Sequence, residues 1–183
     1  ALYQYQLGLT AEKSGDVDAA LLAYAKAAEL DKKNVDARVN LGRLYLESGF
    51  ADKALAVLDE AYRIDPRSLE ANNNLANAYG TKALFDKSVF HYEAALALAP
   101  RDPTIRMNLA KAYVQSGALP KARETYIELL KLAPTNWDAM YELGKTYLSL
   151  GDQASARKTL SELLAKKPDF KSRLEVETIL SGL

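Results

Sequence analysis

A 34-residue period runs through this chain and constrains its fold more than any other feature. A Leu followed by Gly or Ala recurs every 34 residues without an insertion, at Leu7, Leu41, Leu75, Leu109 and Leu143. Eight positions after each Leu stands a turn residue, which is Gly in four repeats and Ala83 in the third. Units of this length bury their apolar faces only by stacking on one another. The period therefore predicts one continuous array.

Each repeat has the pattern of two helices joined by a short turn. Leu7 and Ala11 recur at helical spacing with their equivalents, and so do Ala20 and Tyr24. Glycine in the turn ends a helix readily, because it adopts the left-handed conformation without a Cβ clash. We expect helices over roughly positions 2 to 14 and 18 to 31 of each repeat. At Ala83 the same turn lacks glycine, which predicts a local distortion there.

The pattern resembles the tetratricopeptide repeat family over essentially the whole chain. It includes the small residues Ala20, Ala54, Ser88, Ala122 and Ala156, and prolines near the repeat ends at Pro66, Pro100, Pro134 and Pro168. It departs from the family where Trp is frequent, with Gln4, Arg38, Asn72, Arg106 and Met140. The resemblance implies an all-α fold, a right-handed α-solenoid in which about 11 helices form a superhelix of antiparallel pairs.

The resemblance also implies a division of the chain. We expect a single solenoid domain over 1–183, made of repeats 1–34, 35–68, 69–102, 103–136 and 137–170. The remaining segment, 171–183, carries an apolar stripe at Val176, Ile179, Leu180 and Leu183, with polar residues between them. Repeat arrays need terminal units with a polar outer side. This segment is therefore expected to be a capping helix.

In this family the first helices line a concave groove, and the resemblance implies that positions 2, 5, 6, 9, 12 and 13 of each repeat face it. Position 6 holds Gln6, Asn40, Asn74, Asn108 and Glu142. The three asparagines resemble a ladder by which some family members hold an extended peptide. A carboxamide suits this role, because it offers both donors and an acceptor to a peptide group. The alternative is that these asparagines satisfy local polar groups.

Other groove positions add charge and an aromatic residue. Position 9 contributes a basic component, and Tyr141 is a candidate anchor because aromatic residues are enriched at interface hot spots. The predicted peptide-binding residues are Asn40, Arg43, Asn73, Asn74, Asn77, Asn108, Lys111, Tyr141 and Lys145. The family's carboxylate clamp is not expected, because Asp138 and Glu142 stand where it needs basic residues.

The N-terminal helix carries an apolar stripe on a side expected to be exposed, formed by Leu2, Tyr5 and Leu9. Exposed apolar patches often mark interaction sites. Three interpretations compete: a docking site, a homo-oligomer contact through this end, and a surface that preceding sequence once covered. The last is the one we favour at this stage, because Tyr3 stands where other repeats have a small residue.

Composition excludes several functional classes. Lys plus Arg and Asp plus Glu both number 24, a balance that does not indicate nucleic-acid binding. The chain has no Cys and one His, His91, which we expect on the solvated outer side of a second helix. One His without Cys predicts no metal site, no cofactor site and no catalytic triad. No stretch approaches the roughly 20 apolar residues that membrane insertion requires.

These observations predict a non-catalytic scaffold, not an enzyme, that binds a peptide or protein segment in its concave groove. Two alternatives remain open. The chain could be an assembly subunit that associates through its ends or its convex side, or it could be the targeting arm of a larger enzyme.

Overall fold

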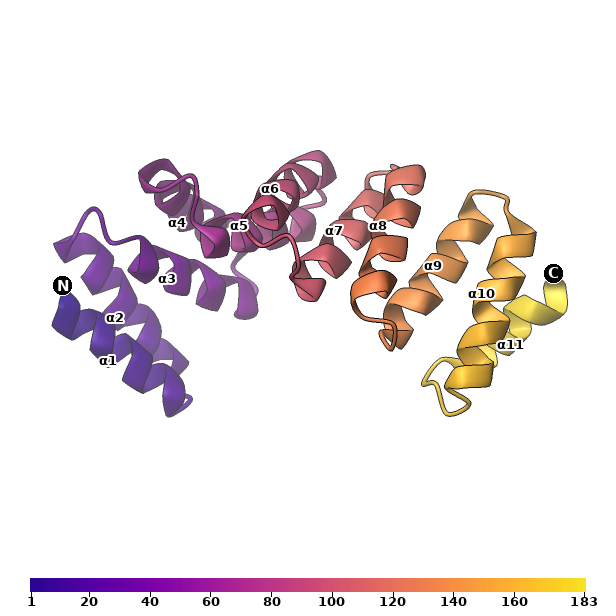
Figure 1. Cartoon of the computed structure of the whole chain (residues 1–183). Helices are drawn as coiled ribbons and strands as arrows, with labels where there is room; N and C mark the ends of the chain where they lie inside the picture. The colour runs from indigo at the N-terminus through magenta and orange to yellow at the C-terminus, as the bar shows by residue number, and fades with distance from the viewer. The chain divides into compact units, whose positions relative to one another are not determined.

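The structure is a computed structural model that describes all residues 1–183. It contains eleven α-helices and no strand, so the predicted all-α class and helix count are confirmed (Figure 1). The chain divides into two compact units, Ala1–Ala99 and Pro100–Leu183. Unit 1 holds α1 (Leu2–Lys13), α2 (Val17–Leu30), α3 (Val35–Glu47), α4 (Ala51–Ile64), α5 (Leu69–Thr81) and α6 (Phe85–Leu98). Unit 2 holds α7 (Pro103–Gln115), α8 (Leu119–Leu132), α9 (Trp137–Ser149), α10 (Gln153–Lys166) and α11 (Arg173–Gly182).

The first helix of each of the last four repeats begins at a side-chain cap. Asn34, Ser68, Asp102 and Asn136 each accept a hydrogen bond from the backbone N–H three residues later. Such a bond satisfies a helix amide that has no partner within the helix, and it contributes on the order of 1 kcal/mol. α3, α5, α7 and α9 therefore start at positions 35, 69, 103 and 137, in step with the sequence period.

The two helices of a repeat approach closely because the first contributes a residue with little or no side chain. A Cβ added to Gly42 would lie 2.4 Å from Cγ of Leu58, and one added to Gly144 would lie 2.5 Å from Cδ2 of Leu160. Leu58 and Leu160 are fully buried, so neither can move aside into solvent. The repeated Gly or Ala is thus the contact point of each helical pair.

The turn inside each repeat has the same left-handed conformation throughout. Gly49 has a φ of 81°, and Ala83 takes the equivalent position with a φ of 55°. The turn hydrogen bonds are retained at Ala83, whose N–H donates to Gly80 O at 3.0 Å. The distortion predicted for this loop is therefore absent, and Ala83 itself adopts the conformation that disfavours a Cβ.

Two residues at the repeat position where the family often has Trp stabilise the connections between repeats by hydrogen bonds. The guanidinium of Arg38 donates to the carbonyls of Ala28, Asp31 and Asn34. The Asn72 amide donates to Pro66 O and Ser68 O, both at 2.9 Å. Each side chain thus donates to carbonyls where one helix ends and the next begins.

Helix α11 packs against the last pair of helices. Val176 is fully buried, and Ile179 and Leu180 pack against the core cluster that contains Leu160 and Phe170. The helix starts at Arg173, two residues after the start of the expected segment, with Ser172 at its N-cap position.

The packing at Gly42 can be tested with a matched pair of substitutions. Gly42→Ala places a methyl group against Leu58, and we expect it to destabilise the protein by about 1–3 kcal/mol through overpacking. Gly80→Ala is the control, because its Cβ would meet only Ser88 Oγ at 3.4 Å. Alanine is favoured over glycine inside a helix by about 1 kcal/mol, so this variant should be neutral or stabilised. Urea unfolding followed by circular dichroism measures both, and equal midpoints would contradict the proposed contact.

Candidate functional site

The first helices of unit 1 form one face, which we call the first-helix face of unit 1. The Asn40 amide on α3 donates to the Tyr5 hydroxyl on α1 at 3.2 Å. Arg43 on α3 forms an ion pair with Glu12 on α1. α3 is also in direct contact with α5. The predicted groove residues of repeats two and three therefore lie on neighbouring helices of this face.

The basic position of this face is neutralised by the protein itself. Arg43 pairs with Glu12 and, at 2.8 Å, with Glu47. Glu12 also accepts a hydrogen bond from the Tyr24 hydroxyl at 2.9 Å. Arg43 therefore adds little unbalanced positive charge, although the sequence places it among the basic groove residues.

The asparagines of α5 differ from one another in their surroundings. Asn77 accepts a hydrogen bond from the Tyr92 hydroxyl. Asn74 is only 8% exposed, yet it makes no hydrogen bond within the protein. The only fully enclosed side-chain atoms without a partner are Arg106 Nε and the Tyr126 hydroxyl, so the Asn74 amide still meets solvent. A mostly buried carboxamide with open hydrogen-bonding capacity suits a ligand that approaches from this face.

In unit 2 the predicted residues Asn108 and Lys111 line a hollow of about 260 Å³ at the start of α7 and α9. Its other lining residues are Pro103, Thr104, Met107, Asn136 and Asp138. We call it the α7–α9 hollow. Two of the predicted binding residues are thus brought together in one concave site.

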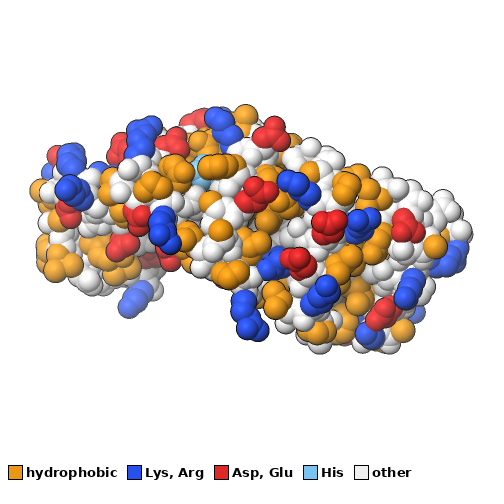
Figure 2. Space-filling view, turned by 45° about the horizontal axis from the view of Figure 1, so that its top comes forward, with side chains coloured by type: hydrophobic (Ala, Val, Ile, Leu, Met, Phe, Trp, Pro, Cys, Tyr) orange, Lys and Arg blue, Asp and Glu red, His pale blue; other side chains and the backbone are white.

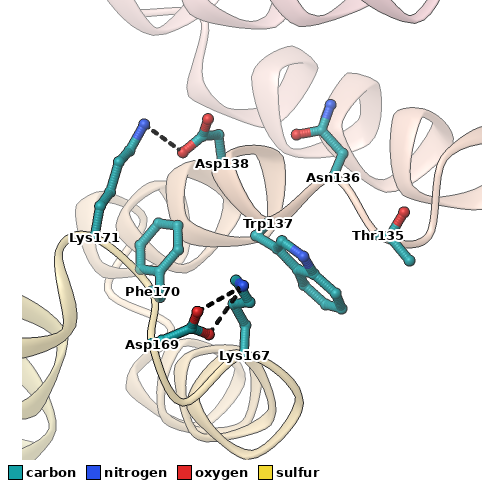
Figure 3. Close-up of a pocket in the computed structure, with 8 residues that line it drawn as sticks. All are labelled: Thr135, Asn136, Trp137, Asp138, Lys167, Asp169, Phe170 and Lys171. Carbon is teal, nitrogen blue, oxygen red and sulfur yellow. Dashed lines mark hydrogen bonds and ion pairs between the residues drawn. The ribbon is translucent and has the colours of Figure 1, made fainter.

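A second hollow in unit 2 lies beside the loop between α10 and α11 and has a volume of about 380 Å³ (Figure 3). Trp137 and Phe170 supply its aromatic surface, and sequence reasoning did not single out either residue. Two ion pairs flank the rings, Lys171 with Asp138 at 2.8 Å and Lys167 with Asp169 at 2.9 Å. We call it the Trp137 hollow.

Tyr141 is a core residue, which corrects its prediction as an exposed anchor. It is 7% exposed and packs against Phe170, with ring centroids 5.5 Å apart. Burial is also the main cause that raises its pKa. Lys145 Nζ lies 4.9 Å from the centroid of the Tyr141 ring and 3.9 Å from the Glu142 carboxylate. Lys145 is thus half-buried and already engaged with its own helix.

The apolar stripe on α1 is split between two environments. Leu2 is 72% exposed, whereas Tyr5 and Leu9 pack against the core cluster around Tyr24. Tyr3 and Leu7 are exposed instead, at 71% and 39%. The apolar surface of α1 therefore differs from the predicted stripe.

His91 is buried, which corrects its predicted place on the solvated surface. It is 6% exposed and contacts the rings of Tyr62, Tyr79 and Phe90. Its Nδ1 lies 3.0 Å from Asn72 Oδ1. The Asn72 amide nitrogen already donates to two carbonyls, so Oδ1 accepts and Nδ1 donates. Burial lowers the pKa of His91, because the charged ring would lose its hydration.

The face drawn in Figure 2 carries no patch of a single charge sign. Figure 2 shows acidic and basic side chains interspersed over the face in view, with apolar side chains between them. No cluster of three His, Cys, Asp or Glu side chains has a metal-binding arrangement. None of the helices combines the length and the apolar character needed to span a bilayer.

Comparison with known families identifies the repeat. One tetratricopeptide repeat model matches residues 5–68 and 109–169, and a second matches 84–132. The chain belongs to the tetratricopeptide repeat family. Its fold is an all-α solenoid of helical pairs, and members of the family act as protein-interaction scaffolds.

Solved structures of tetratricopeptide repeat proteins superpose on most of the chain. A crystal structure of MamA is 26% identical, has a TM-score of 0.83, and the match covers 88% of this chain and 95% of that one. MamA from Desulfovibrio magneticus RS-1 is 18% identical with a TM-score of 0.85, and the match covers 93% of this chain and 96% of that one. YrrB, described as a TPR protein with an unusual peptide-binding site, is 19% identical with a TM-score of 0.87. The match covers 96% of this chain and 90% of that one. The latter two likenesses show the fold alone. No curated protein sequence matches the chain.

The buried His91 predicts a pH dependence of stability. Its folded-state pKa is lowered, so the unfolded chain binds a proton first as the pH falls below about 6.5. Above that pH the neutral ring makes its full contribution to the free energy of unfolding. This contribution is lost as the pH falls towards the folded-state pKa, and the free energy of unfolding then decreases by at most about 1.4 kcal/mol per pH unit.

The measurement is urea unfolding of wild type and His91→Gln at several values between pH 7.5 and 5.5. His91 is the only histidine, so the difference between the two proteins isolates its titration. We expect wild type to lose stability relative to the variant on acidification. Parallel curves would show that His91 does not titrate differently on folding.

Proposed function

We propose that this chain is a non-catalytic scaffold that binds an extended peptide or protein segment along its first helices. The observation that carries the proposal is Asn74, a carboxamide that is 8% exposed and has no hydrogen-bond partner in the protein. Its amide atoms still meet solvent, so a bound peptide group could replace that water with a hydrogen bond. Function, not folding, is therefore the simplest reason for an asparagine at this position.

The neighbouring side chains support the same ligand class. Asn40 has one amide hydrogen engaged with Tyr5, and its carbonyl oxygen is open to a ligand. Asn108 lines the α7–α9 hollow and has no partner of its own. Carboxamides bind the peptide backbone without selecting a side chain, so they suit an extended segment. The peptide-binding site described for YrrB, which has the same fold, also favours a peptide ligand.

The test compares capture of partners by wild type and by the triple variant Asn40→Ala, Asn74→Ala, Asn108→Ala. Immobilised full-length chains are exposed to lysate of the source organism, and bound proteins are quantified by mass spectrometry. We expect the partner to bind at least about tenfold less to the variant, because each lost hydrogen bond contributes on the order of 1 kcal/mol.

A matched control changes three exposed residues of the second helices, Asp18→Ala, Glu124→Ala and Lys158→Ala. Circular dichroism verifies that all three proteins retain their helix content. A partner that binds wild type and the asparagine variant equally would reject the first helices as the site.

A second candidate function is association through the first helix, and one observation favours it. Tyr3 and Leu7 are exposed at repeat positions where Ala37 and Leu41 are buried, at 0% and 4%. In later repeats of each unit the preceding second helix covers these positions, as α2 covers α3. The exposed surface of α1 could therefore receive a helix from another copy.

The corresponding variant is Tyr3→Glu with Leu7→Glu, measured by size-exclusion chromatography with light scattering. If α1 mediates self-association, wild type gives a mass above 20.1 kDa that increases with concentration, and the variant stays monomeric. A wild type that is monomeric at every concentration would reject this function.

A further inference from the structure

The α7–α9 hollow and the Trp137 hollow are adjacent in unit 2. Asn136 and Asp138, at the start of α9, line both of them. An extended segment that crosses the start of α9 would therefore pass from one hollow into the other. The two hollows differ in chemistry, and that difference indicates which side chains such a segment carries.

The α7–α9 hollow has an unbalanced positive charge. Lys111 is exposed and forms no ion pair. Asp138, the only acid in the lining, is already paired with Lys171 at 2.8 Å. The amide hydrogens of Asn108 are also free. An ammonium beside an open amide group favours a carboxylate, which accepts hydrogen bonds from both.

The Trp137 hollow has aromatic surface and no unbalanced charge. Its two lysines are each paired with an aspartate, and these pairs flank the rings of Trp137 and Phe170 (Figure 3). Phe170 is 6% exposed and belongs to the core, so it forms a rigid wall, whereas Trp137 is only partly buried. A rigid aromatic wall beside a partly exposed ring favours an aromatic side chain of the ligand.

We propose that unit 2 recognises an extended peptide in which an acidic side chain lies close in sequence to an aromatic one. The acid binds Lys111 and Asn108 in the α7–α9 hollow. The aromatic ring packs against Trp137 in the neighbouring hollow. This inference rests on the proposed function, and it adds a side-chain preference for the part of the ligand that binds unit 2.

The first experiment selects ligands from a random-peptide phage library on the immobilised full chain. We expect wild type to enrich peptides that pair Asp or Glu with a nearby aromatic residue. Lys111→Glu should reverse the charge preference, enriching Lys or Arg at the acidic position. Lys158→Glu is the matched control, because Lys158 is an exposed lysine of the same unit on α10, outside both hollows.

The second experiment measures the affinity of a capped synthetic peptide taken from the enriched set, with Phe or Tyr as its aromatic residue. Trp137 is the only tryptophan of the protein, so its fluorescence reports binding at this site directly. We expect Lys111→Glu to weaken binding at least tenfold, and a peptide with Lys in place of its acid to recover most of that loss. Trp137→Ala should weaken binding at least fivefold, measured by anisotropy of a labelled peptide.

The outcomes separate this inference from the proposed function. If the enriched peptides show no acidic bias and bind Lys111→Glu as tightly as they bind wild type, the inference is overturned. The triple asparagine variant would then still test the proposed function. Equal weakening by Lys111→Glu and Lys158→Glu would also overturn it, because long-range attraction would then explain the effect. If the folded protein enriches no peptide at all, the inference and the proposed peptide ligand both fail.

Discussion

The close approach of the two helices within each repeat is the contact on which the rest of the structure depends. At Gly42 and Gly144 the backbone of one helix lies directly against a buried leucine of the next, with no space for a methyl group. This contact sets how the two helices of a pair pack, and each pair then presents its other sides to its neighbours. The first helices of a unit can form a common face only because every pair is built in the same way.

The first helices carry different chemistry in the two units. In unit 1 the ionic group of Arg43 is satisfied internally, and the open groups are carboxamides. In unit 2 an unpaired lysine and an aromatic hollow lie at the start of α9. Under the proposals made above, unit 1 would bind peptide backbone and unit 2 would select side chains.

The sequence was sufficient to predict the helices, because each depends on a local signal that recurs with a fixed period. The caps at Asn34 and Asp102 and the turn glycines act within a few residues of the position they define, and the small residues at the helix contacts recur with the same period. Even Ala83 obeys the period, since the turn around it holds the backbone in the conformation that glycine adopts elsewhere.

Side-chain environments were harder to predict, because they depend on partners far along the chain. Arg43 was expected to give the face a positive charge, but Glu12, 31 residues earlier, neutralises it. His91 was expected in solvent, but three aromatic rings and Asn72 enclose it. Tyr141 was expected at the surface, but Phe170 covers it. Trp137 was overlooked because its hollow exists only where two loops meet.

The tyrosine hydroxyls beside the first-helix face of unit 1 determine which amide atoms its asparagines leave open to a ligand. The Tyr92 hydroxyl donates to the carbonyl oxygen of Asn77, and the Asn77 NH₂ group has no partner in the protein. Tyr5 engages the NH₂ group of Asn40, which leaves the Asn40 carbonyl oxygen open. A polypeptide is itself polar, with N–H and C=O groups in a fixed order along its length. A peptide bound as proposed would therefore find a free amide group on α5 and a free carbonyl oxygen on α3.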